Sequence, residues 1–229
     1  MSSNYVQASK RTLAGDVYET LRADILSCRV APGTKLRIND IHSQLGVNLG
    51  AVREALSKLS SEGLVTAEAQ KGFCVAPVSR QELVDLTSTR IDIENLCLAE
   101  AIANGDAAWE SGIVASLHFL SRQSERDPAD PARLSERWVV AHAAFHQALV
   151  DACRNGVKMR IRASLYDQSE RYRRLSVPAR GTANRDTLAE HRAIADAALA
   201  KDTPTATRLM GEHLNRTTEI LLAAPFLEE

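Results

Sequence analysis

Residues 49–59 read LGAVREALSKL, and the structure predicted for the first part of the chain depends on them. Its apolar residues recur at helical spacing and form one stripe: Val52, Ala55, Leu56 and Leu59. Asn48 is an expected N-cap and Gly63 an expected terminator, so the sequence predicts a helix from about 49 to 61. The stripe would pack inward, which leaves the first turn and the opposite face exposed.

Two further helices are expected before this stretch and two strands after it. Apolar residues from Leu13 to Leu26 recur at helical spacing until Ala31-Pro32-Gly33 breaks the pattern, and a short helix is expected from about Asn39 to Leu45. Leu64-Val65-Thr66 and Phe73-Cys74-Val75-Ala76 are typical of two short strands around a turn. Three helices followed by a hairpin predict a winged helix-turn-helix.

Beyond Pro77 the sequence has helical periodicity almost throughout and is rich in Ala and Leu. Turn-forming residues divide it into helices expected at about 80–104, 106–125, 131–154, 156–176, 185–201 and 203–223. The predicted fold is therefore mainly α, with an N-terminal winged helix-turn-helix followed by an all-α antiparallel bundle of about six helices. We expect a flexible N-terminal arm at residues 1–10, the winged domain at 11–77, a linker at 78–83 and the bundle at 84–229.

The composition excludes several protein classes. The 229 residues are 45% apolar, with 28 Lys plus Arg against 29 Asp plus Glu, which is ordinary for a globular protein and unlike a disordered one. Four separated cysteines without a CxxC pair indicate neither a zinc ribbon nor a disulfide framework. No apolar run approaches the roughly 18 residues of a membrane span, and the first residues lack a signal peptide's apolar block. We therefore expect a cytoplasmic protein with no membrane partner.

The exposed side of the 49–59 helix carries groups that can read DNA. In the major groove Arg can pair with guanine and Asn with adenine, and this side presents Asn48, Gly50 and Arg53. Lys71, at the tip of the wing, would reach a phosphate or the minor groove. The plainer alternative is a solvated helix with an ordinary surface arginine.

The order of these motifs resembles the DNA-binding domain of the GntR superfamily. Five segments carry the resemblance, and they occur in the family's order with no insertion or deletion between them: residues 31–36, 45–47, 52–56, 62–65 and 71–73. It implies that Arg53 occupies the position of the family's base-contacting arginine, although members often have arginine where this chain has Asn39 and Leu49. The expected partner is double-stranded operator DNA, bound by a homodimer because two half-sites must be met at a fixed spacing. The expected DNA contacts are Arg37, Asn39, Asn48, Gly50, Arg53, Lys71 and Gly72.

Four of the six histidines fall on the expected bundle helices. His142 and His146 are four residues apart, so they share one face of a helix with Cβ atoms roughly 5–6 Å apart. His191 lies in the fifth expected bundle helix and His213 in the sixth, each within a mainly apolar pattern. Four imidazoles from three helices could converge inside the bundle and accept one metal. A hydrogen-bonded surface pair is the plainer explanation of an HxxxH spacing alone.

The order Phe145-His146, Glu190-His191-Arg192 and Glu212-His213-Leu214 resembles the FCD ligand-binding domain of the FadR subfamily. In that domain three histidines, with one residue four positions before the first, hold a divalent metal. The resemblance implies the metal ligands His142, His146, His191 and His213, where many relatives have Asp or Asn at the first position. Imidazole suits zinc, nickel, copper or iron better than magnesium or calcium, so we expect a divalent transition metal, zinc before nickel.

A buried divalent metal beside a fixed guanidinium would favour a carboxylate. Arg90, one helical turn before Glu94, matches an arginine that lines the family's pocket and is the expected bidentate clamp. The expected effector-binding residues are Arg90, Glu94, Tyr172 and Arg173. The alternatives are a surface ion pair between Arg90 and Glu94 and, for residues 171–174, a solvated basic face.

Within the subfamily, residues 70–73, 81–83 and 142–146 are most similar to the CsiR type of repressor, which answers to a short dicarboxylate. The resemblance implies a transcriptional repressor released by a C4–C6 dicarboxylate such as glutarate. Two alternatives stay open: a regulator whose histidines bind effector without metal, and an enzyme acting on a small acid through metal-activated water. No Glu or Asp stands beside His146 as an obvious base, so we predict that the protein is not an enzyme. His42 and His118 match no motif and are assigned to surface or packing roles.

Overall fold

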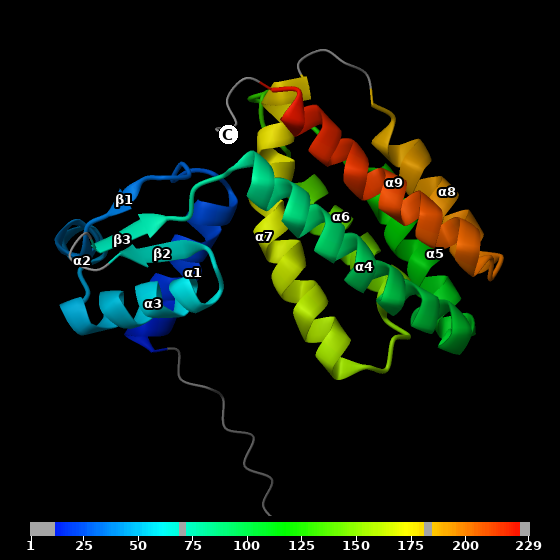
Figure 1. Ribbon diagram of the computed structural model, residues 1–229, viewed down its shortest axis with the longest axis horizontal. Helices are drawn as coiled ribbons and strands as arrows, with labels where there is room; N and C mark the ends of the chain where they lie inside the picture. Colours follow the sequence, from blue (N-terminus) through cyan, green and yellow to red (C-terminus); the bar gives the residue numbers. More distant parts are fainter. Residues whose placement is uncertain (1–11, 69–71, 181–184, 225–229) are drawn as a thin grey trace, which may run out of the picture. The chain divides into compact units, whose positions relative to one another are not determined.

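The computed structural model describes residues 12–68, 72–180 and 185–224. The chain is mainly helical and divides into two compact units, residues 1–77 and 78–229 (Figure 1). None of the helices in the described ranges combines the length and apolarity that a membrane crossing needs. The arm expected at residues 1–10 and the predicted wing-tip contact Lys71 lie outside the described residues.

The first unit confirms the predicted winged helix-turn-helix. Its elements are α1 (Leu13–Leu26), β1 (Lys35–Leu36), α2 (Ile38–Leu45), α3 (Leu49–Ser61), β2 (Val65–Glu68) and β3 (Gly72–Val75). Asn48 caps α3 as expected, because its Oδ1 accepts a hydrogen bond from the Ala51 backbone N–H at 2.8 Å. Gly46 ends α2 in the left-handed conformation, at φ 65°, which glycine adopts without strain.

The short strand β1 was not expected from the sequence, because two residues are too few to give a strand period. It pairs antiparallel with β3, which also pairs with β2, so the sheet order is β1-β3-β2. Leu36 lies opposite Phe73 in this pairing. The sheet and the three helices share one core, whose buried members include Val17, Leu21, Ile25, Ile41, Val52, Leu56, Leu59, Val65 and Val75.

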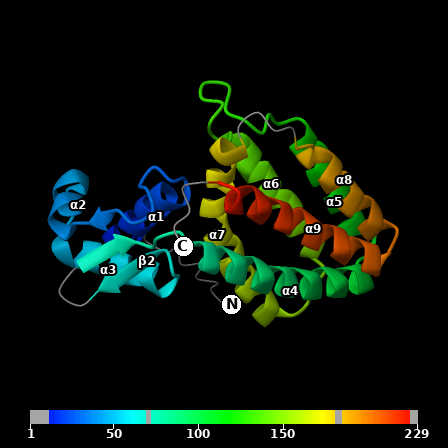
Figure 2. The same cartoon turned by 45° about the horizontal axis from the view of Figure 1, so that its top comes forward.

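The second unit is the predicted bundle of helices (Figure 2). Its elements are α4 (Arg80–Asn104), α5 (Ala107–Ser121), α6 (Glu136–Val150), α7 (Gly156–Arg180), α8 (Thr187–Leu199) and α9 (Thr203–Leu222). Ser79, Asp106, Asp186 and Asp202 cap four of these helices by accepting a backbone N–H in the first turn. Residues 80–83, expected in the linker, form the first turn of α4.

The segment between α5 and α6 is longer than the sequence indicated. Asp127 Oδ1 accepts the Ala129 N–H at 2.8 Å, and Asp130 Oδ1 accepts the Ala132 N–H at 3.1 Å. These side chains satisfy backbone donors in turns, so α5 ends at residue 121 rather than 125 and α6 begins at 136 rather than 131. In contrast, α7 continues through Pro178 to Arg180, beyond the expected end at residue 176.

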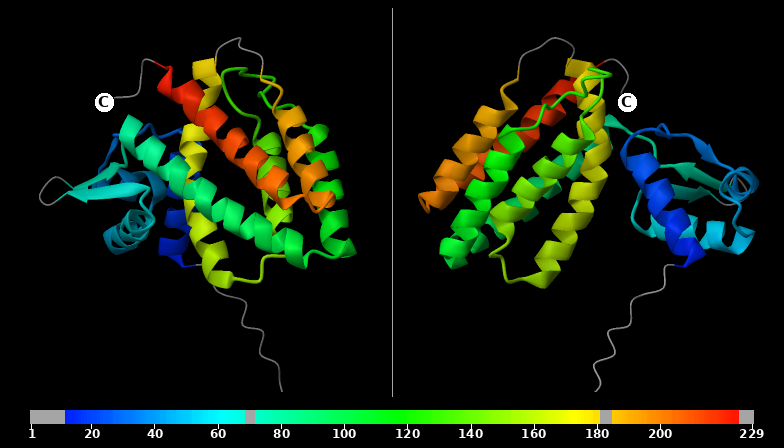
Figure 3. Two further views of the ribbon diagram at one scale, coloured as in Figure 1. Left: turned by 45° about the vertical axis from the view of Figure 1, so that its right-hand side comes forward. Right: turned by 180° about the vertical axis from the view of Figure 1, so that it is seen from behind.

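Both consecutive helices and helices distant in sequence pack side by side in the bundle. α4 contacts α9 and α7, α5 contacts α6 and α8, and α8 contacts α9, as the two views of Figure 3 show. Their shared core includes Cys97, Leu98, Ile113, Trp138, Phe145, Leu149, Ile194, Ala198, Met210 and Leu214. Because α6, α8 and α9 all contribute to this core, polar groups on their inner faces can meet in the interior.

Candidate functional site

Helix α3 presents one apolar and one polar face, as its sequence predicted. The stripe Val52, Ala55, Leu56 and Leu59 is buried, and the opposite residues Asn48, Gly50, Arg53 and Ser57 are exposed. The side-chain oxygen Oδ1 of Asn48 caps α3, which leaves the side-chain N–H groups of Asn48 available to a base.

An open hollow of about 490 Å³ lies beside this exposed face. Four of the predicted DNA contacts line it, although they come from separate segments: Arg37, Asn39, Arg53 and Gly72. Lys35 adds a further cation, and Asp40 an acid, to the same rim. Asn48 and Gly50 are exposed at the start of α3 and do not line the hollow. The fold therefore gathers most of the predicted contacts around Arg53.

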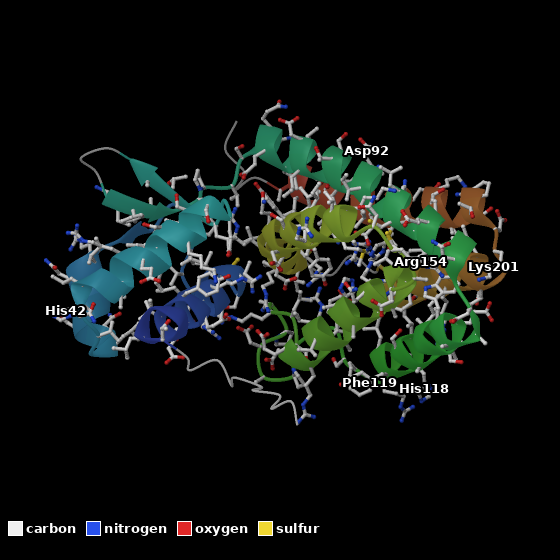
Figure 4. All side chains as sticks on the ribbon, turned by 90° about the horizontal axis from the view of Figure 1, so that it is seen from below. His42, Asp92, His118, Phe119, Arg154 and Lys201 are labelled. Atoms are coloured by element: carbon white, nitrogen blue, oxygen red, sulfur yellow. The ribbon has the colours of Figure 1, made fainter. Side chains whose placement is uncertain are left out.

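In the bundle, four histidines come together as the sequence suggested. His142 and His146 project from α6, His191 from α8 and His213 from α9, and all four are buried. One potential ligand atom of each lies within 4.8 Å of the others. Among the described residues this is the one such group of metal-ligand type. The other two histidines, His42 on α2 and His118 on α5, are exposed (Figure 4).

Burial keeps the four imidazoles neutral. It is the largest cause that lowers the pKa of His142, His146, His191 and His213, and positive neighbours such as Arg173 add to it. Neutral imidazole is the form that binds a metal.

The donor set fits a divalent transition metal. His142 Nε2 and His146 Nε2 lie 3.1 Å apart, close to the roughly 3.3 Å that two nitrogens on one tetrahedral zinc would show. His191 Nε2 and His146 Nδ1 are buried without a hydrogen-bond partner among the described residues. A buried nitrogen without a partner is costly, and a metal that accepts the lone pair of His191 Nε2 would remove this cost.

An outer carboxylate orients His213. Its Nδ1 lies 2.7 Å from Glu190 Oε2, and Arg185 donates to both Glu190 oxygens at 2.9 and 2.6 Å and to the His213 backbone oxygen at 2.9 Å. Burial would raise the pKa of Glu190, but the hydrogen bonds from Arg185 and His213 outweigh it and hold the pKa well below its usual range. The ionised carboxylate thus keeps the proton on Nδ1 and frees Nε2, the arrangement common at metal-bound histidines.

A small cavity adjoins the cluster. It measures about 40 Å³, and its lining includes Arg90, His142, Arg173 and His213. Arg90 is buried and forms no hydrogen bond with the described residues, while its guanidinium carbon lies 4.9 Å from the Tyr166 ring centre. Burial lowers the pKa of Arg90, although Glu94 opposes the shift. A buried guanidinium with unused donors is suited to receive an anion.

The structure separates Glu94 from the predicted effector residues. Glu94 is fully buried, and its Oε1 accepts a hydrogen bond from Arg162 Nε at 2.8 Å, so the surface Arg90–Glu94 pair is not formed. Arg162 also donates to the His146 backbone oxygen at 2.8 Å. Glu94 thus supports α6 rather than lining the cavity. Tyr172 lines the cavity, but its hydroxyl donates to Glu82 at 2.7 Å.

Tyr166 and Arg173 contact the cluster directly. Arg173 Nη1 lies 2.8 Å from His142 Nδ1 and 2.8 Å from the Tyr166 hydroxyl oxygen. Arg173 was expected at the cavity, whereas Tyr166, Arg162 and Arg185 were missed because no spacing in the sequence relates them to a histidine. Glu190 could have been found, since it directly precedes His191.

Both units match models of known families. Residues 13–75 match "Bacterial regulatory proteins, gntR family", and residues 85–216 match the FCD domain.

Two relatives are similar over most of their length. The chain is 41% identical to the HTH-type transcriptional regulator BphR of Paraburkholderia xenovorans, over 93% of this chain and 87% of the relative. It is 35% identical to the HTH-type transcriptional repressor GlaR of Escherichia coli, over 87% of this chain and 91% of the relative. Both names describe transcriptional regulators.

Solved structures share the fold. McbR/YncC of E. coli has a TM-score of 0.72 at 19% identity, covering 92% of this chain and 97% of that one. A GntR regulator from Rhodococcus sp. RHA1 has a TM-score of 0.67 at 24% identity, covering 92% and 98%.

Proposed function

Because the chain belongs to the gntR family of bacterial regulatory proteins and carries an FCD domain, we propose that it is a repressor released from operator DNA by a short dicarboxylate. That it is a transcriptional regulator follows from the family matches and relatives. The repressor name of GlaR supports this sign of regulation. A homodimer would meet two operator half-sites, with the predicted residues around Arg53 contacting DNA.

One observation carries the effector proposal: the unpaired Arg90 guanidinium lines the same small cavity as His142 and His213, two members of the cluster of four buried imidazoles. His142, His146, His191 and His213 would hold zinc, or nickel as the second choice. The bound metal would supply a positive charge that attracts one carboxylate. Arg90 would clamp the second carboxylate by two parallel N–H donors, which favours a C4–C6 dicarboxylate such as glutarate.

The cavity must enlarge to accept such a molecule. Its 40 Å³ is far below the roughly 300 Å³ of an ordinary ligand pocket. Arg90, whose long side chain forms no hydrogen bond with the described residues, is the part of the lining that can move most easily. An effector changes operator affinity only if two arrangements of the protein bind it differently, and we propose that residues 76–79 transmit this difference.

Chelation is expected to abolish the effector response while the protein stays folded. The full chain, purified without a nickel column, is analysed for metal and then melted with succinate, glutarate, adipate or acetate, before and after dialysis against a chelator. We expect about one metal per chain and a higher melting temperature with a dicarboxylate, lost on chelation. Far-UV circular dichroism reports whether the metal-free chain is folded.

Simultaneous loss of the helical signal and the effector response on chelation would contradict this expectation. A dicarboxylate shift that persists without metal would instead support a regulator whose histidines bind the effector directly. The repressor part of the proposal is tested with an operator recovered by selection. Fluorescence anisotropy measures whether a dicarboxylate releases the protein from this DNA.

Replacing Arg90 with methionine is expected to weaken dicarboxylate binding roughly 10- to 100-fold, since hydrogen bonds to a charged group contribute about 1.5–3 kcal/mol. Isothermal titration calorimetry with glutarate measures the change. Arg137→Met, which removes an exposed arginine from α6, is the matched control and should bind glutarate like the wild type. Equal affinities of Arg90→Met and wild type would exclude Arg90 as the clamp.

A further inference from the structure

The two ring nitrogens of His142 face different partners. Nδ1 lies 2.8 Å from Arg173 Nη1 and 3.3 Å from the Tyr166 hydroxyl oxygen. Nε2 lies 3.1 Å from His146 Nε2. The Tyr166 oxygen itself lies 2.8 Å from Arg173 Nη1, so Arg173, Tyr166 and His142 form one connected group.

The contact with Arg173 fixes which nitrogen of His142 carries the proton. A guanidinium has only donors, so Nδ1 must accept and must keep its lone pair. The proton of the neutral ring is therefore on Nε2, where it can be donated to His146 Nε2. In this arrangement His142 offers no lone pair toward the other three histidines.

His142 can become a ligand through Nε2 only if its proton moves to Nδ1. An N–H at Nδ1 cannot face the N–H groups of Arg173, so the guanidinium must withdraw. The Tyr166 hydroxyl is the neighbouring group that can accept from Nδ1, because oxygen has lone pairs and lies 3.3 Å away. Such an acceptor on the far nitrogen is what usually orients a metal-bound histidine.

We propose that Arg173 holds His142 in a form that cannot bind metal, and that Tyr166 holds it in the form that can. This inference rests on the metal site of the proposed function and adds a regulatory role for two residues of this chain. Arg173 lines the cavity, so an effector carboxylate can accept hydrogen bonds from its guanidinium. His142 Nδ1 would then lose its contact with Arg173. Metal and dicarboxylate then bind with positive coupling, and each raises the affinity for the other by the same factor.

The two positioning residues have opposite expected effects on Zn²⁺ affinity. Tyr166→Phe removes the acceptor and should weaken Zn²⁺ binding about tenfold, the lower end of the usual effect of an outer partner. Arg173→Met removes the competing donor and should tighten it by a similar factor. Two side chains with only a structural role would both weaken binding when replaced.

Loss of a positive charge alone could also tighten metal binding, so a matched control is needed. Arg90→Met removes a buried guanidinium near the same cluster without touching a His142 hydrogen bond. We expect Arg173→Met to bind Zn²⁺ more tightly than Arg90→Met, and Tyr166→Phe to bind it more weakly than the wild type. In a His142→Asp background the carboxylate has lone pairs for Arg173 and for the metal at the same time. There Arg173→Met should raise the Zn²⁺ affinity no more than Arg90→Met does.

The experiment titrates each full-length variant with Zn²⁺ against a chromophoric chelator at one pH, with circular dichroism to verify folding. Glutarate should tighten Zn²⁺ binding in the wild type and not in Arg173→Met. Three outcomes would each overturn the inference and leave the metal site standing. They are a Zn²⁺ affinity of Arg173→Met no higher than that of Arg90→Met, a Zn²⁺ affinity of Tyr166→Phe equal to that of the wild type, and no effect of glutarate on Zn²⁺ binding by the wild type. A wild-type chain that binds no Zn²⁺ would overturn both.

Discussion

Replacing Arg53 with alanine is expected to abolish specific operator binding. One bidentate contact between an arginine and guanine contributes about 1–3 kcal/mol of discrimination. A homodimer would lose two of them, or about 2–6 kcal/mol, which is a loss of roughly 30-fold to more than 10⁴-fold in affinity. Arg53 is exposed on α3 and lines the hollow that also gathers Arg37, Asn39 and Gly72.

Fluorescence anisotropy with a selected operator and with a scrambled duplex measures the effect of Arg53→Ala. Arg29→Ala is the matched control, since Arg29 is an exposed arginine of the same unit that pairs with Asp24 and does not line the hollow. The control should bind the operator like the wild type, and the bundle of Arg53→Ala should still bind glutarate. Wild-type operator affinity of Arg53→Ala would place DNA recognition on another surface.

The winged domain could be predicted well because its signals are local. The apolar stripe of residues 49–59, the cap at Asn48 and the left-handed glycine at position 46 are set by neighbours in sequence. Strand β1 was missed because its two residues are a strand only through pairing with β3. The hollow beside Arg53 could not be predicted either, since it needs β1, α2 and β3 to meet.

The histidine cluster was predictable in its members but not in its surroundings. The spacing of His142 and His146 on one helix is a local signal, and the other two followed from resemblance. In contrast, the pairing of Glu94 with Arg162 joins residues 68 positions apart, and no helical period indicates it. The same holds for Arg173 and His142, where a predicted effector residue proves to contact a predicted metal ligand. Tertiary packing decides these contacts.

Acid is expected to destabilise the metal-free protein strongly, beginning near pH 6.5. Folding lowers the pKa of four buried histidines below the value of about 6.5 in the unfolded chain. Between 6.5 and the lowered values, the unfolded state binds protons that the folded state does not. The free energy of unfolding therefore falls as pH falls, by up to about 1.4 kcal/mol per pH unit for each histidine, or about 5–6 kcal/mol per unit for four.

Urea unfolding of the metal-free chain between pH 8 and pH 5.5 measures this slope. Stability should be nearly constant above pH 7.5 and should drop steeply below 6.5, a large change against the 5–15 kcal/mol of a typical protein. His191→Asn removes one of the four groups and should reduce the slope by about a quarter. Equal stability at pH 7.5 and pH 5.5 would mean that the imidazoles are protonated in the folded chain, which contradicts a buried cluster of neutral metal ligands.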